Sequence, residues 1–97
     1  MLGEVERVLG SVAAQLMSGE EVVLENQKIR VRRVGSGGLR AVQFQQNGRM
    51  LEAIEQNAAK PSRWGQLARE GHRVVQFRDV LLRKYVAVAV DGVVREY

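Results

Sequence analysis

The segment that decides the fold is Leu39–Glu55, LRAVQFQQNGRMLEAIE. Two apolar-rich runs flank Asn47-Gly48, the dipeptide most typical of a two-residue β-hairpin, because a type I′ turn needs positive φ at both central residues. The turn predicts a register with the cross-strand pairs Gln46–Arg49, Phe44–Leu51 and Val42–Ala53. We therefore expect a long hairpin in the middle of a sheet, with one apolar face.

An amphipathic helix is predicted over Leu2–Met17. Its apolar residues recur at three- and four-residue steps and so line one face: Leu2, Val5, Val8, Leu9, Val12 and Leu16. Ser18-Gly19 ends the pattern, and Gly19 is expected to adopt a left-handed cap. We expect the apolar face to cover the protein's own sheet or a subunit interface; docking of a partner helix is the alternative.

A second, shorter helix is predicted over Pro61–Glu70, with Pro in its first turn and Gly71 at its end. Trp64 and Leu67 lie on one face of it. Trp64 is the only tryptophan in the chain. We interpret it as a buried contact between helix and sheet, and a ligand-stacking surface is the alternative.

The remaining segments alternate apolar and polar residues, as half-buried strands do, and are joined by short turns. Besides the two strands of the hairpin, the predicted strands are Glu20–Leu24, Gln27–Val34, His72–Phe77, Tyr85–Val90 and Val93–Tyr97. The fold class is thus α+β: a mainly antiparallel, strongly twisted or partly rolled sheet of about six to seven strands. It has an N-terminal helix and one short helix between strands 4 and 5, and both helices are expected to cover one face.

Length and composition predict a single domain over residues 1–97. The chain is 45% hydrophobic and 27% charged, as in ordinary globular proteins. It contains no Cys, which excludes disulfides and thiolate chemistry. The N-terminus carries acids where a signal peptide carries positive charge, and no apolar run is long enough to span a bilayer, so we expect a cytoplasmic protein without membrane contact.

A basic strand is the candidate binding surface. The net charge is +4, the pI is about 10.1, and Arg outnumbers Lys twelve to three. Alternation places Lys28, Arg30 and Arg32 on one strand face, and Arg33 and Arg40 flank the loop Gly35-Ser36-Gly37-Gly38. Such a row can track a phosphate backbone, which predicts a nucleic-acid or anion-binding site; a merely solvated strand face is the alternative.

No enzyme signature is present. His72 is the only histidine, no Gly-x-Ser-x-Gly elbow occurs, and one His with carboxylates makes a poor zinc site. We interpret His72 as a capping or surface residue. Accordingly we predict no catalytic residue, no metal site and no cofactor.

The sequence therefore favours a non-enzymatic binding or interaction domain of unknown ligand that self-associates as a homodimer, the commonest oligomer. A free edge of the last strand is one surface through which two copies could pair. The first alternative is a nucleic-acid-binding domain that uses the basic strand. The second is a small enzyme whose site is not visible in the sequence.

Overall fold

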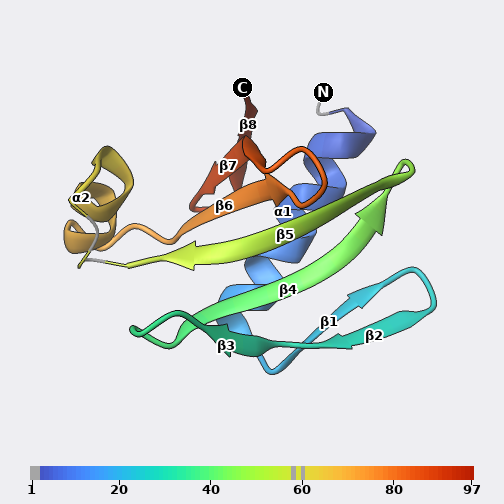
Figure 1. The fold of residues 1–97 in the computed structure, drawn as a ribbon, viewed down its shortest axis with the longest axis horizontal. Helices are drawn as coiled ribbons and strands as arrows, with labels where there is room; N and C mark the ends of the chain where they lie inside the picture. Colours follow the sequence, from blue (N-terminus) through green and yellow to red (C-terminus); the bar gives the residue numbers. More distant parts are fainter. Residues whose placement is uncertain (1–2, 58, 60) are drawn as a thin grey trace.

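The computed structural model describes residues 3–57, 59 and 61–97 (Figure 1). Its elements, in chain order, are α1 (Glu4–Ser18), β1 (Glu21–Leu24), β2 (Gln27–Arg30), β3 (Arg32–Val34), β4 (Leu39–Gln46), β5 (Arg49–Gln56), α2 (Arg63–Arg69), β6 (Val74–Asp79), β7 (Lys84–Val90) and β8 (Val93–Glu96). The predicted α+β class with a mainly antiparallel sheet is confirmed.

The central hairpin forms as predicted. Asn47 and Gly48 both have positive φ, at 52° and 75°, as a type I′ turn requires. The three predicted cross-strand pairs are all present in the ladder between β4 and β5. Local turn chemistry has therefore set the register of the longest strand pair.

The sheet is a meander in which each strand pairs with the next along the chain, from β3 to β8, and β1–β2 form a separate ladder. The strand predicted over residues 27–34 is in fact two strands, because this stretch changes partner at Val31. Before it, β2 pairs with β1; the N–H of Val31 then bonds the carbonyl of Glu20 (2.9 Å), and β3 pairs with β4. One sheet of about six to seven strands was expected; the described residues form eight strands, six in the main sheet and two in the separate ladder. α2 follows the fifth strand rather than the fourth.

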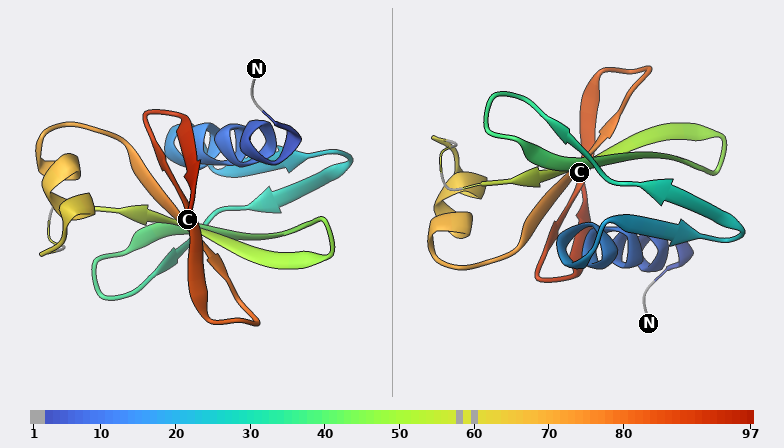
Figure 2. Two further views of the ribbon diagram at one scale, coloured as in Figure 1. Left: turned by 90° about the horizontal axis from the view of Figure 1, so that it is seen from above. Right: turned by 90° about the horizontal axis from the view of Figure 1, so that it is seen from below.

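Helix α1 lies inside the curve of the sheet (Figures 1 and 2). Its buried residues are Leu9, Val12, Ala13 and Leu16. They pack in one core with inward-facing strand residues that include Val42, Phe44, Leu51, Ala53, Val75 and Phe77. The predicted apolar stripe therefore covers the protein's own sheet, although Leu2, its first expected member, lies outside the described residues.

The C-terminal end of α1 differs from the prediction. Gly19 is extended, at φ −156° and ψ −170°, and not left-handed. Its N–H still bonds the carbonyl of Gln15, and the chain turns directly into β1. The prediction of a left-handed cap was wrong because the helix leads straight into a strand instead of closing in a glycine turn.

α1 also lies between the separate β1–β2 ladder and the last strand of the sheet, in contact with β1 on one side and β8 on the other. Gln15 binds the outer edge of β1: its amide donates to the carbonyl of Val23 (3.1 Å) and accepts from the N–H of Val23 (2.7 Å). A strand edge left with free N–H and C=O groups is a template for aggregation. Here a helix side chain satisfies those groups.

Helix α2 begins after Ser62, whose hydroxyl accepts from the N–H of Gly65 (3.3 Å), and Gly71 follows it with φ 97°. It contacts β5 and β6 at one end of the sheet, away from α1 (Figure 1). Its neighbours there include Val88 and Val90 of β7, which alternate with the core residues Ala87 and Ala89 and so face outward. The expectation that both helices cover one face was therefore wrong: α1 fills the inner face, and α2 lies on the outer one.

Candidate functional site

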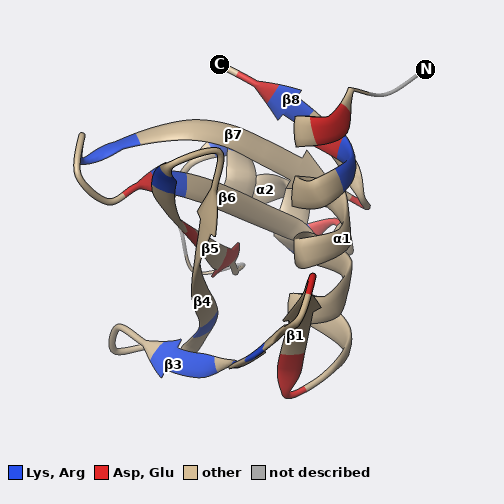
Figure 3. Cartoon of the chain, turned by 90° about the vertical axis from the view of Figure 1, so that its right-hand side faces the viewer, with Lys and Arg blue, Asp and Glu red and all other residues tan. Residues whose placement is uncertain are grey.

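The basic strand is exposed as expected. Lys28, Arg30 and Arg32 are exposed, whereas Ile29 and Val31 between them are half-buried against the core. Figure 3 shows the positive charge of β3 at one end of the molecule, with acidic residues of β1 at the same end. The predicted alternation is thus present across the break between the two strands.

Three of the five candidate cations have partners within the fold. Arg32 forms an ion pair with Glu52 on β5. Arg33 donates to the carbonyl of Gly38 across its own loop (3.1 Å). Within the described residues, the side chains of Lys28 and Arg30 make no hydrogen bond or ion pair, so the anion-binding prediction now rests mainly on these two.

Arg40 has a structural role that the sequence did not indicate. Its guanidinium donates to the carbonyls of Leu16 (3.3 Å) and Met17 (2.8 Å) in the last turn of α1. These carbonyls have no partner within the helix, and a positive charge there also complements the helix dipole. Arg40 therefore fastens the end of α1 to the sheet.

A groove between α2 and the outer face of β7–β8 is the most complete candidate site. It encloses about 280 Å³ and is lined by Arg63, Trp64, Leu67, His72, Val88, Val90, Val93 and Arg95. Trp64 and Leu67 are three residues apart on α2 and so share a face. Val88 and Val90 lie two apart on β7, and Val93 and Arg95 two apart on β8, so each pair also shares a face. The apolar walls of the groove thus follow periodicities that the sequence contains.

The charged and titratable side chains of the groove are all basic. Its apolar walls come from one tryptophan, one leucine and three valines, and the remaining lining residues are Arg63, His72 and Arg95. None of the lining side chains carries a hydroxyl, a thiol or a carboxyl group. The arrangement can hold an apolar body beside a negative charge.

His72 is held in place by Asp91, in the turn between β7 and β8. The ring Nδ1 lies 2.6 Å from one carboxylate oxygen, and the other oxygen accepts from the N–H of Arg73 (2.9 Å). The Arg73 N–H, followed by His72, holds the pKa of Asp91 below its ordinary value. Because Nδ1 faces Asp91, the ring has a fixed orientation and Nε2 is the nitrogen available to a ligand.

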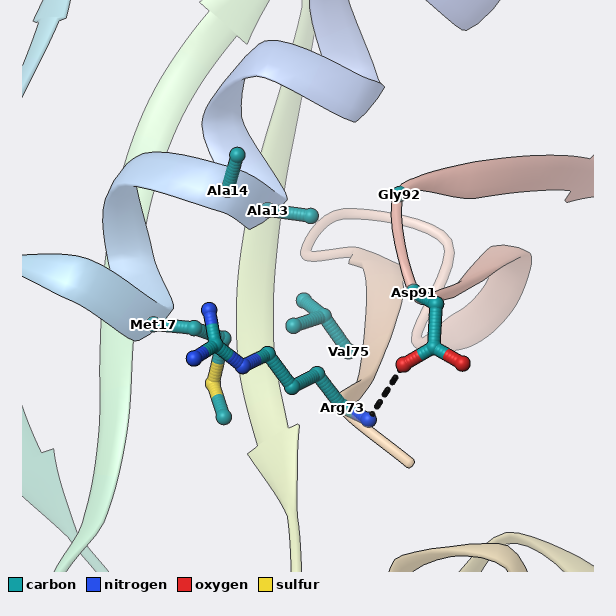
Figure 4. Close-up of a pocket in the computed structure, with 7 residues that line it drawn as sticks. All are labelled: Ala13, Ala14, Met17, Arg73, Val75, Asp91 and Gly92. Atoms are coloured by element: carbon teal, nitrogen blue, oxygen red, sulfur yellow. Dashed lines mark hydrogen bonds between the residues drawn. The ribbon is translucent and has the colours of Figure 1, made fainter. Parts of the chain in front are cut away.

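A second hollow, of about 230 Å³, lies between α1 and the β7–β8 turn (Figure 4). Its lining residues are Ala13, Ala14, Met17, Arg73, Val75, Asp91 and Gly92. It is smaller than the groove and contains charges of both signs. Its carboxylate already bonds the backbone beside it, so this hollow selects no ligand charge.

Comparison with known proteins gives no match. No family model, no curated protein and no solved structure matches this chain. In residues 3–57, 59 and 61–97, no helix is long and apolar enough to cross a membrane. The same residues contain no cluster of three or more His, Asp or Glu side chains placed to hold a metal ion.

The sequence predicts Trp64 as a buried contact between helix and sheet, with a ligand-stacking surface as the alternative. In the structure Trp64 is half-buried, and part of its surface lines the groove. The sequence does indicate part of the groove, since Val88, Val90 and Val93 form an apolar row on the face opposite the core. It does not indicate where α2 packs, and the position of α2 is what turns that row into a groove.

Proposed function

We propose that this protein is a non-enzymatic binding domain whose groove between α2 and β7–β8 holds a small amphiphilic anion, such as an aliphatic or aromatic carboxylate. The observation that carries the proposal is the composition of the lining: apolar walls with Arg63, His72 and Arg95 as its charged or titratable side chains. Guanidinium groups suit carboxylates because they donate two parallel hydrogen bonds.

The size of the groove limits the ligand. Small-molecule sites usually enclose roughly 300–1,000 Å³, and this groove, at about 280 Å³, lies just below that range. Octanoate has the right character, with an apolar chain and one carboxylate. If each non-hydrogen atom of octanoate contributes roughly 0.5 kcal/mol of binding free energy, the Kd of octanoate would be about 0.2 mM.

Trp64 provides a direct probe, because it is the only tryptophan and lines the groove. Titration of the whole chain with octanoate should give a saturable change in tryptophan emission. The uncharged 1-octanol should bind about tenfold more weakly, since it lacks the ion pair with arginine, worth about 1.4 kcal/mol.

Matched variants assign the site. Arg95→Gln and Arg63→Gln should each weaken octanoate binding about tenfold. Arg83→Gln, an exposed arginine on the turn between β6 and β7, should leave it unchanged. The proposal fails if wild-type emission shows no saturation up to about 10 mM octanoate, or if Arg83→Gln weakens binding as much as Arg95→Gln.

A further inference from the structure

An exposed apolar patch lies at the end of the sheet formed by the β6–β7 turn and the end of β8. Its members are Leu81, Leu82, Tyr85 and Tyr97, with exposed fractions of 80%, 63%, 43% and 64%. Leu82, Tyr85 and Tyr97 border one open hollow of about 530 Å³. Large apolar side chains gathered on one surface mark an interaction site more often than a free surface.

The turn that carries the two leucines is fixed by a buried carboxylate. One oxygen of Asp79 accepts from the N–H groups of Leu81 (3.1 Å) and Leu82 (2.9 Å), and the other faces Nε of Arg49 (3.4 Å). The N–H of Arg83 also bonds the carbonyl of Asp79 (2.8 Å). The side chain of Asp79 is only 4% exposed. The leucines are therefore presented by an ordered turn, which lowers the entropy lost when a partner covers them.

Charges of opposite sign flank the patch. Arg83 and Lys84 follow the leucines on the turn, while Glu96 lies on β8, and both Lys84 and Glu96 line the hollow. Glu6, in the first turn of α1, lies beside Glu96 and raises the pKa of that carboxyl. Arg49 lines the same hollow and lowers the pKa of Glu96 in turn, but its guanidinium is also paired with Asp79. Two carboxylates that share one already paired cation leave net negative charge, which a basic group from outside would neutralise.

We propose that the patch binds a second copy of this chain in a two-fold dimer. In a two-fold interface the same surface faces itself, so residues on one side of the patch meet residues on the other side of the partner's patch. Leu81, Leu82, Tyr85 and Tyr97 then pack against their counterparts. Arg83 and Lys84 of each copy face Glu6 and Glu96 of the other. The proposal is independent of the ligand groove.

The free edge of β8 is the competing surface. The bond from the Tyr97 N–H to the Val86 carbonyl (3.0 Å) fixes the alternation, so that Val94 and Glu96 direct their backbone groups outward. A two-fold pairing of Val94 with Glu96 would place Arg95 directly opposite Arg95. Like charges in that position disfavour the pair.

The first test is the molar mass of the full chain by light scattering, over a range of concentrations. We expect a dimer with a micromolar Kd that weakens with salt. Leu81→Ser with Leu82→Ser should raise the dimer Kd about tenfold or more, because it removes exposed apolar surface without touching the core. Val23→Ser, which alters a 48% exposed valine on β1, is the matched control and should leave the mass unchanged.

A mixing experiment tests the charge pairing. A variant with Arg83→Glu and Lys84→Glu, and a variant with Glu6→Gln and Glu96→Lys, should each be monomeric alone and form a heterodimer when mixed. The proposal is overturned if the wild-type chain is monomeric at about 1 mM, if the double-serine variant dimerises like wild type, or if the mixture stays monomeric. Loss of the dimer on Val94→Pro alone, with the folded spectrum retained, would assign the interface to the β8 edge instead.

Discussion

At the scale of single residues, Arg40 shows how tertiary contacts decide what a charged side chain does. Its backbone lies in a half-buried strand, and its guanidinium binds the last carbonyls of α1. Hydrogen bonds from a charged donor to otherwise unpaired carbonyls stabilise more than a surface ion pair does.

Arg40→Gln should therefore lower the free energy of unfolding by about 1–2 kcal/mol. Urea denaturation followed by circular dichroism measures this. Arg30→Gln is the matched control and should stay within about 0.5 kcal/mol of wild type, because exposed surface substitutions rarely do more. Equal effects of the two changes would remove the proposed role of Arg40.

The two cations of the basic strand that are unpaired within the described residues, Lys28 and Arg30, allow a prediction about polyanion binding. If only Lys28 and Arg30 bind phosphate, the slope of log K against log salt for duplex DNA should be about −2. Fluorescence anisotropy with a labelled oligonucleotide at several salt concentrations measures it, and Lys28→Glu with Arg30→Glu should abolish the signal. A slope of about −4 to −5 would show that all five predicted cations bind phosphate after all.

At the scale of elements, the hairpin turn between β4 and β5 depends on a glycine in the left-handed region. Gly48 has φ 75°, and a Cβ there would meet no atom within 4 Å, so the cost of a side chain is conformational. Gly48→Ala should destabilise by about 1–2 kcal/mol. Gly19→Ala is the matched control, because Gly19 is extended and its new Cβ would lie 3.9 Å from the nearest atom. That change should be neutral or slightly stabilising, and an equal loss at both positions would refute the conformational explanation.

The contact between α1 and β1 gives a second prediction at this scale. Gln15→Ala removes two hydrogen bonds to Val23 and leaves the edge of β1 open. We expect a loss of about 1–2 kcal/mol and faster aggregation on heating. Arg7→Ala, at an exposed position of the same helix, controls for helix propensity. Static light scattering during a thermal ramp, together with urea denaturation, separates edge exposure from a simple loss of stability.

At the scale of the whole molecule, two sets of carboxyls give stability opposite dependences on pH. The N–H of Leu82 and the side chain of Arg49 lower the pKa of Asp79, and the N–H of Arg73 and the side chain of His72 lower that of Asp91. The stability that these two carboxylates contribute is complete above their ordinary pKa of 3.8 and is lost as the pH falls through their lowered folded-state pKa values. Glu96 has the reverse sign. Its pKa is raised from 4.5 by Glu6, so stability falls as the pH rises from 4.5 through the raised value.

A plot of the denaturation midpoint against pH should therefore fall on both sides of a maximum in the acid range. Asp79→Asn or Asp91→Asn should flatten the fall at low pH, the lower limb, and Glu96→Gln should flatten the fall at higher pH, the upper limb. If Glu96→Gln leaves the upper limb unchanged, the proximity of Glu96 to Glu6 does not affect the stability of the fold. Because the proposed dimer places cations opposite Glu96, the upper limb should also shrink at concentrations where the dimer forms.

The sequence by itself determined those features that depend on neighbours along the chain. Asn47-Gly48 determined the turn and, through it, the register of Phe44 with Leu51, because backbone φ at two residues fixes how the strands leave a tight turn. The three- and four-residue spacing in the first helix likewise determined which face of α1 is buried.

Tertiary structure decided the rest, because partner choice depends on residues far apart in the chain. Nothing local in residues 27–34 indicates that this stretch leaves β1 for β4 at Val31. Arg32 and Arg40 have the same charge in the sequence, yet one pairs with Glu52 and the other binds the end of α1. The groove has the same origin: its valine row is visible in the sequence, but only the packing of α2 on the outer face of the sheet turns that row into a site.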